Sequence, residues 1–357
     1  MAGVIVSKRE RGQVFIAAAL LLPVLLGMSA LAVDLGSYAG ERRSLQNSAD
    51  AIALAAAQDL PDATAAQATA QTWATKNGVS LSNLTVTIGG GNTSPQVSVS
   101  ITKPHAFAFI GALGVGPQNV GAKAVAAKFS PGAIGGLMPW AITQATVDAT
   151  APGQPVTIKY GAGGGTTGNY GAIDIDGNGA NTYRSTIEHG AQGVVCSSAM
   201  PNCSPSSCPG PNCAENAQSC TGPQCPSEPG NMVGPTDQGV QYRLDHTTAA
   251  CSSFSSVFTP NGSGYNLTPA CNPWSAGACP QPDNGAACSR RVIVIPIVDQ
   301  FGNGKKPVTV LGFALLWLDS SSGGVVTGRF VNANVDMGAL TGGYDPNSLI
   351  HFAKLIQ

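Results

Sequence analysis

The longest apolar stretch of the chain lies near its N-terminus. From Gly12 to Val33, 22 consecutive residues carry no charge, and a helix needs about 20 apolar residues to cross the hydrocarbon core of a bilayer. The basic residues within residues 1–11 favour the cytoplasmic side, which directs the rest of the chain outward. The pattern therefore predicts a cytoplasmic N-terminus, a transmembrane helix over residues 12–33 and an extracytoplasmic bulk.

A cleavable signal peptide is the alternative. Ala30 and Ala32 flank Leu31, and this spacing of small residues fits a signal-peptidase site after Ala32. Two features oppose cleavage: the apolar run exceeds the signal-peptide core of about 7 to 15 residues, and the helical pattern does not stop at Ala32. The sequence favours an uncleaved, single-pass anchor in the cytoplasmic membrane.

The helical pattern continues beyond Asp34. Positions spaced by three and four residues form a stripe, which predicts that one helix leaves the membrane and continues to residue 60. We expect this stripe to pack against the small unit that follows it or against a partner subunit. Its residues are Leu35, Tyr38, Arg42, Leu45, Ala49, Ile52 and Ala56.

Short periodic segments follow the long helix. A helix is predicted over residues 65–76, and alternating residues at 84–88 and 97–101 predict a β-hairpin around a glycine-rich turn. A helical turn and a third strand at 120–129 complete the pattern. Together with the helical extension, these segments predict a small pilin-like α+β unit over residues 34–131.

The remainder, residues 132–357, is predicted to be a mainly β domain, with a sandwich as its architecture. Residues 292–296 and 311–318 are apolar on both faces, so we place them in the centre of the core. Pro296 should lie at a strand end or bulge because it cannot donate to a ladder. The predicted strands are residues 156–160, 171–175, 291–298, 308–317 and 325–335.

All ten cysteines lie in a Cys-rich insertion, residues 196–288, of this domain. An even number of cysteines in one loop-rich region predicts disulfides formed in an oxidising compartment. Zinc is the alternative, but no C-x-x-C pair is present. The sequence leaves the pairing open. The cysteines are Cys196, Cys203, Cys208, Cys213, Cys220, Cys225, Cys251, Cys271, Cys279 and Cys288.

A candidate calcium loop follows the predicted strand at 171–175. Asp174, Asp176 and Asn178, with Gly179 after them, fit the D-x-D-x-N-G pattern of oxygen ligands at alternating positions before a sharp turn. The twelfth position of the loop is Ser185, where an EF-hand places a bidentate Glu. Calcium binding is therefore one interpretation, and an Asp/Asn/Gly turn is the other. We predict no other cofactor.

Charge and motifs narrow the function further. With 18 Lys+Arg against 19 Asp+Glu the net charge is −1, so the electrostatic footprint of a nucleic-acid-binding protein is missing. We find no nucleophile-elbow motif and no local Cys/His signature. The sequence thus predicts no catalytic residues, no small-molecule substrate and a protein that is not an enzyme.

Three segments around the apolar stretch carry a family resemblance. They are KRERGQ at residues 8–13, LAVDLG at 31–36 and ERRSLQNSADA at 41–51. Together they resemble the N-terminal region of the TadG-like (TadE/TadG-related) proteins of Flp (Tad) pilus assembly. Ala17 lies five residues after Gly12, where a pilin of that system carries Glu, which disfavours processing as a pilin.

The resemblance implies a bacterial envelope protein that supports Flp/Tad pilus assembly or an allied secretion apparatus. Its implied partners are other Tad/Flp pilus-assembly subunits and the lipid bilayer. The alternative is a secreted or surface adhesin, a binding module whose disulfide-stapled loops and calcium loop contact a ligand.

Overall fold

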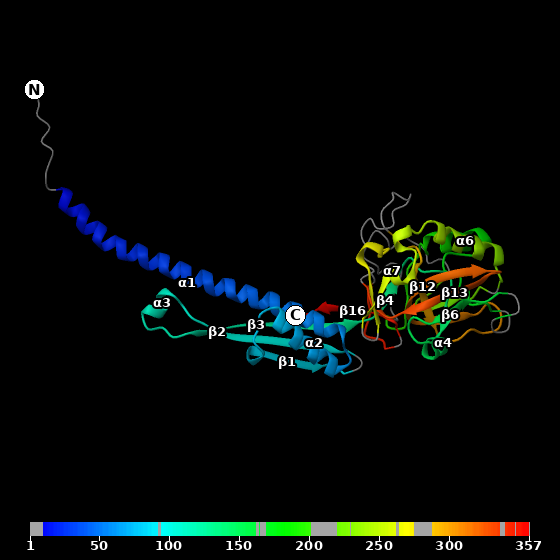
Figure 1. Cartoon of the computed structure of the whole chain (residues 1–357), viewed down its shortest axis with the longest axis horizontal. Helices are drawn as coiled ribbons and strands as arrows, with labels where there is room; N and C mark the ends of the chain where they lie inside the picture. The colour runs from blue at the N-terminus through cyan, green and yellow to red at the C-terminus, as the bar shows by residue number, and fades with distance from the viewer. Residues whose placement is uncertain are drawn as a thin grey trace, which may run out of the picture. The chain divides into compact units, whose positions relative to one another are not determined.

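The computed structural model describes residues 10–91, 94–161, 164, 169–200, 220–228, 230–261, 264–274, 288–335, 340–346 and 348–356. The chain forms two compact units (Figure 1). Unit 1 comprises residues 1–89, 96–127 and 355–357, and unit 2 comprises residues 90–95 and 128–354.

Unit 1 is organised by one long helix, α1 (Glu10–Gln58), which runs uninterrupted through Pro23. Its apolar half is exposed, with 81% of Phe15 and 61% of Leu25 accessible. Among the described residues it is the one helix long and apolar enough to cross a membrane. The predicted apolar helix that continues beyond residue 34 is confirmed, and it has the properties of a membrane anchor.

The second half of α1 packs against helix α2 (Ala63–Lys76). Asp62 caps α2 by accepting hydrogen bonds from the amides of Thr64 (2.9 Å) and Ala65 (3.0 Å), which satisfies amides that lack a partner within the helix. Small side chains allow the two helices to approach closely. Those buried on α1 are Ala49, Ala53, Ala56 and Ala57, and those on α2 are Ala66, Ala70 and Ala74.

An antiparallel sheet completes unit 1. It contains β1 (Leu84–Gly89), β2 (Gln96–His105) and β3 (Gln118–Phe129), in that order. Alternate residues of β2, Val97, Val99 and Ile101, are fully buried, as the period of two of a strand with one core face requires. Short helices η1 (Leu81–Asn83) and α3 (Phe109–Ala112) precede β1 and β3. The amide of Ile356 donates to the carbonyl of Val125 (2.8 Å), so the last residues of the chain extend along β3.

Unit 2 is built around a central sheet of order β5-β11-β12-β13-β6, with β8 paired to β12. The strands are antiparallel, except that β5 runs parallel to β11. Their bounds are β5 (Ile142–Thr143), β6 (Pro155–Lys159), β8 (Gln224–Pro226), β11 (Val292–Val298), β12 (Pro307–Ser322) and β13 (Val325–Val331).

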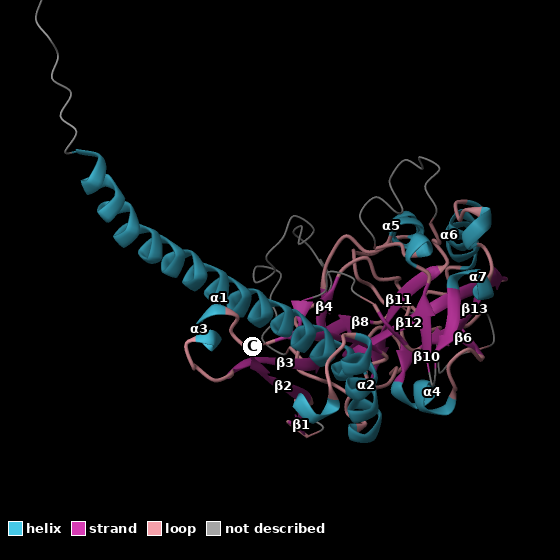
Figure 2. Ribbon diagram, turned by 60° about the vertical axis from the view of Figure 1, so that its left-hand side comes forward, coloured by secondary structure: helices cyan, strands magenta, loops and turns pink. Residues whose placement is uncertain are grey.

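Both faces of this sheet are covered. All seven residues of β11 are buried: Ile293, Ile295 and Ile297 join one apolar cluster, while Val292, Val294 and Val298 join the other. The first cluster includes residues of helices α5 (Ala180–His189) and α6 (Val233–Asp245), which lie side by side in Figure 2. The strand that is apolar on both faces therefore lies in the centre of the core.

The remaining elements of unit 2 are short. The helices are α4 (Gln144–Ala149), η3 (Ala249–Cys251), α7 (Phe254–Val257) and η4 (Pro269–Cys271). The strands form small pairings: β4 (Pro131–Ile134) with β7 (Val195–Cys196) and β15 (Leu340–Thr341); β9 (Phe258–Asn261) with β10 (Gly264–Leu267); and β14 (Ala333–Asn334) with β16 (Ile350–Leu355).

Two expectations for the distal domain were wrong in detail. The α+β fold with disulfides is confirmed, but helices α5 and α6, rather than a second sheet, cover one face of the central sheet. Residues 171–175 form only isolated bridges, Trp140 with Ala172 and Ile173 with Ser227. Pro296, for which we predicted a strand end or a bulge, lies inside β11 opposite Phe313, one residue before an irregularity in the pairing between Ile297 and Val298.

The buried face of α1 predicts a stability effect that an exposed residue elsewhere in unit 1 should not have. Ile52 is fully buried in unit 1, so Ile52→Ala should lower the free energy of unfolding by about 2–5 kcal/mol. Leu81 is half-exposed in the same unit, and Leu81→Ala should change it by no more than about 0.5 kcal/mol. Urea unfolding of the full chain in detergent measures both values, and equal effects would contradict this packing.

Candidate functional site

The carboxylate of Asp34 lies at the point where the charge-free stretch of α1 ends, and only 1% of the residue is exposed. It accepts hydrogen bonds from three successive amides at the start of α3: Ala108 (2.9 Å), Phe109 (3.0 Å) and Ile110 (2.7 Å). Burial raises the pKa of Asp34, but the three hydrogen bonds outweigh it and hold the pKa below its usual value. Asp34 therefore joins α1 to the turn between β2 and β3.

A polar cluster one to two helical turns further along α1 makes the next connection. Glu41 accepts from Lys103 Nζ at 2.7 Å and also binds His105 Nδ1. The other ring nitrogen of His105 lies 3.2 Å from Ser37 Oγ. The hydrogen bonds to Lys103 and His105 lower the pKa of Glu41. This cluster, Ser37, Glu41, Lys103 and His105, binds the end of β2 to α1.

Aromatic contacts fill the space between these two connections. The ring of Tyr38 stacks on Phe107 with centroids 6.1 Å apart and meets the edge of His105 at 5.6 Å. The Tyr38 hydroxyl donates to the carbonyl of Asn119 (3.4 Å). The face of α1 from Asp34 to Glu41 is thus occupied by the end of the β2–β3 hairpin.

The structure places the predicted stripe of α1 on two sides of the helix. Leu45, Ala49 and Ile52 are buried, and Ala56 continues them, whereas Leu35 and Arg42 are exposed. The buried face continues from Leu45 toward the charge-free stretch through Glu41 and Asp34, which sequence reasoning did not assign to it. Asp34, Tyr38, Glu41 and Leu45 follow one another at intervals of four, three and four residues. This spacing places them on one face of the helix and is the signal that could have identified Glu41 and Asp34.

The candidate calcium loop does not direct its three oxygen ligands to one point. Asp174 Oδ2 and Asn178 Oδ1 contact Lys305 Nζ at 3.1 Å and 2.5 Å. Asp176 instead accepts from the hydroxyl of Thr186 (2.9 Å) and the amide of Gln192 (3.2 Å). A calcium ion at Asp174 and Asn178 would have to compete with the ammonium group. Among the described residues, no group of three His, Cys, Asp or Glu side chains could hold a metal ion.

Four of the predicted disulfide cysteines form two bonds in unit 2, Cys220–Cys225 and Cys251–Cys271. Cys196 and Cys288 are disulfide-bonded as well. The other four cysteines, Cys203, Cys208, Cys213 and Cys279, lie outside the described residues.

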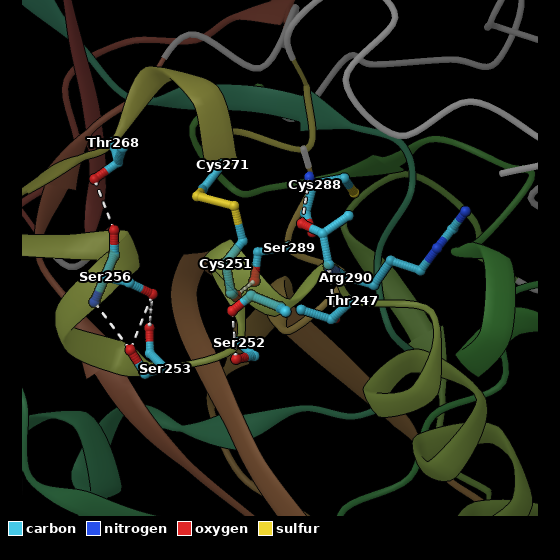
Figure 3. The surroundings of a disulfide bond; sticks show 12 residues. Thr247, Cys251, Ser252, Ser253, Ser256, Thr268, Cys271, Cys288, Ser289 and Arg290 are labelled. Atoms are coloured by element: carbon cyan, nitrogen blue, oxygen red, sulfur yellow. Dashed lines mark hydrogen bonds between the residues drawn. A yellow bond between two sulfur atoms is a disulfide. The ribbon is translucent and has the colours of Figure 1, made fainter. Parts of the chain in front are cut away.

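Hydroxyl groups support the Cys251–Cys271 bond (Figure 3). Ser289 Oγ donates to the carbonyl of Cys251 at 2.9 Å, and Thr268 Oγ1 donates to that of Ser256 at 3.1 Å. Cys251 and Cys271 are almost fully buried within the apolar cluster on one face of the central sheet. The disulfide therefore belongs to the core of unit 2.

Buried cations in unit 2 were not foreseen from the sequence, and Lys159 and Arg243 are two of them. Lys159 Nζ donates to the carbonyls of Asn231 (2.7 Å), Gly324 (3.0 Å) and Tyr160 (3.2 Å), and burial lowers its pKa to about 8. Arg243, whose burial lowers its pKa to about 9, donates to carbonyls at the end of α5. Both side chains satisfy backbone acceptors, which gives them a structural role.

The Glu41 cluster predicts a pH dependence of stability. Because the folded-state pKa of Glu41 is lowered, its contribution is present above its unfolded pKa of about 4.3 and is lost as the pH falls through the folded value. Glu41→Gln should therefore be less stable than the wild type at neutral pH, and this difference should shrink in acid.

Urea unfolding of the full chain at neutral pH and at acidic pH tests this expectation. In Lys103→Met, Glu41 loses one of its two partners, so part of the acid dependence should remain. A difference between Glu41→Gln and wild type that is constant with pH would contradict the role of the carboxylate.

The two described disulfides should differ in their contributions because they close loops of different length. Their sequence separations are 20 residues for Cys251–Cys271 and 5 for Cys220–Cys225. Replacing both cysteines by alanine should cost about 3 kcal/mol for the first pair and about 2 kcal/mol for the second by loop entropy. Unfolding of the two double variants measures this order, and the reverse order would contradict it.

Comparison with known proteins assigns only the N-terminal region. Residues 12–59 match the family model described as putative Flp pilus-assembly TadE/G-like. No curated protein and no solved structure matches the chain. The matched segment contains the charge-free stretch, Asp34, Glu41 and the buried face of α1. The resemblance read from the sequence is thus confirmed: the apolar half of α1 and its packed extension are similar to the TadE/G-like Flp pilus-assembly family.

Proposed function

We propose that the chain is a membrane-anchored structural component that supports Flp/Tad pilus assembly or an allied secretion apparatus. Both folded units are proposed to lie outside the cytoplasm, with the N-terminus inside. The observation that carries this proposal is the family match over residues 12–59, because it covers the apolar half of α1 together with the half that is packed into unit 1.

Two features support the proposed location. The basic residues before the charge-free stretch favour a cytoplasmic N-terminus. The disulfides of unit 2 support an oxidising compartment, since cytosolic proteins rarely keep such bonds.

The proposed action is interaction rather than catalysis, with other Tad/Flp subunits as partners. On α1, the face from Asp34 to Ala56 already packs within unit 1. Partner contacts would therefore use the exposed anchor in the membrane and the outer surfaces of the two units. This assigns the stripe at Leu45, Ala49 and Ile52 to internal packing instead of subunit contact.

The binding-module alternative remains a prediction. The geometry favours it less, because Lys305 occupies the position between Asp174 and Asn178 that a cation would take. Calcium titration of the full chain, compared with Lys305→Met, would test whether the ammonium group excludes the ion.

A complementation experiment tests the proposal. Deleting the gene in a bacterium that carries the Flp/Tad system should abolish or strongly reduce surface pili, and the full chain should restore them. Leu45→Asp with Ile52→Asp, which places charges in the core of unit 1, should insert in the membrane but fail to restore pili. Leu81→Asp is the matched exposed control and should restore them.

The same strains test the anchor. The mature protein should remain in the membrane fraction, and its intact mass should include residues 12–33. A soluble protein that begins at Val33 would indicate cleavage after Ala32 and would favour the secreted binding module. Normal pili in the deletion strain would overturn the assembly role.

A further inference from the structure

The turn between β2 and β3 exposes an apolar tip. This tip, residues 106–115, has the sequence AFAFIGALGV. Leu113 is 85% exposed, Phe109 50% and Val115 43%. Removing these apolar side chains from water would be favourable. Between Lys103 and Lys123 the chain contains no Lys, Arg, Asp or Glu. The tip is thus an uncharged apolar projection of unit 1.

The contacts with α1 show in which direction the tip points. Gln46 donates to the carbonyl of Lys123 (3.0 Å), and Tyr38 donates to that of Asn119 (3.4 Å). Nearest the charge-free stretch, Asp34 binds the amides of residues 108–110. Contacts closer to the tip thus fall at positions on α1 closer to residue 33. Figure 1 shows α3 beside α1 at this end of the hairpin.

The position of Asp34 on α1 shows where the tip lies relative to the predicted membrane span. Asp34 follows directly after the charge-free stretch, and a helix rises about 1.5 Å per residue. Three residues of the tip therefore lie at the end of the predicted membrane span. Tyr38, one turn further out, has the amphipathic side chain that favours the interface between lipid and water.

Several backbone amides of the tip have hydrogen-bond acceptors within the protein and do not need water. The carboxylate of Asp34 satisfies three amides at its start, and the amides of Leu113 and Gly114 donate to the carbonyls of Ile110 and Gly111 at 3.0 Å. Unsatisfied amides are costly in lipid. A turn with these amides satisfied can enter the interfacial layer at lower cost.

We propose that the tip inserts into the interfacial layer of the lipid bilayer beside the anchor, as a second membrane contact. The inference rests on the proposed membrane span of residues 12–33. The position next to the end of that span and the lack of charge favour lipid as the occupant. With two contacts, unit 1 cannot rotate freely about the axis of α1, so one of its faces is held toward the membrane and the others toward partners.

Fluorescence quenching by brominated lipid tests this proposal on the full chain in lipid nanodiscs. Three single variants add one Trp each: Leu113→Trp in the tip, Leu25→Trp in the span and Thr87→Trp as the control. Thr87 is an exposed residue of β1 that pairs with Ser98, away from the tip. The signal of the natural Trp residues, measured in wild type, is subtracted.

The expected result is that brominated lipid removes most of the added emission of Leu113→Trp and of Leu25→Trp but leaves that of Thr87→Trp. The emission of Leu113→Trp should also shift to shorter wavelength relative to Thr87→Trp. Phe109→Trp, which keeps an aromatic ring at its position, should repeat the quenching and guards against a local defect in one variant.

Three outcomes would overturn the inference. If Leu25→Trp is quenched while Leu113→Trp behaves like Thr87→Trp, the anchor holds and the tip is not in lipid. If brominated lipid does not quench Leu113→Trp, and its blue shift appears only with more than one protein copy per nanodisc, the tip binds protein. If Leu25→Trp is not quenched, the membrane span itself fails, and the second contact fails with it.

Discussion

The hydrogen bonds of Asp34 fix how the β2–β3 hairpin is attached to helix α1. A carboxylate at this position must be compensated, because burial of an unpaired charge is very unfavourable. The three amides at the start of α3 provide that compensation. They also set the register of the β2–β3 hairpin along α1, so the cluster at Glu41 and the buried stripe from Leu45 follow from the same alignment.

Unit 2 depends on a different constraint, the two-sided burial of β11 and β12. A central sheet with two apolar faces needs a cover on each face, and α5 and α6 supply one while the loops joined by disulfides contribute to the other. Loops, and the last turn of a helix, leave backbone carbonyls inside the protein without a partner in a helix or sheet. Lys159 and Arg243 donate to such carbonyls, which explains why cations lie in an otherwise apolar interior.

The sequence predicts well those elements whose period is long or regular. The 22 uncharged residues and the alternation in β2 specify α1 and the hairpin. Helices α5 and α6 were missed because ANTYRSTIEH and VGPTDQGVQYRLD are polar, and the second contains Gly and Pro near its start. The cluster of Glu41 with His105 joins residues 64 positions apart, a pairing that local patterns do not encode. Likewise, the D-x-D-x-N-G pattern did not reveal Lys305, which lies 131 positions from Asp174.

Packing separates the residues of the TadE/G-like segment into two groups. Leu45 and Ala49 are buried, and Gln46 binds both Asp50 and the carbonyl of Lys123, so unit 1 itself accounts for these positions. Unit 1 does not bury Arg42, Arg43 and Asn47, which are exposed on α1. Under the proposed function, the second group is the part of the segment that stays accessible to lipid headgroups or another subunit. A tip inserted in the membrane would keep these two groups apart. It would hold one side of α1 against the sheet of unit 1 and leave the other side accessible.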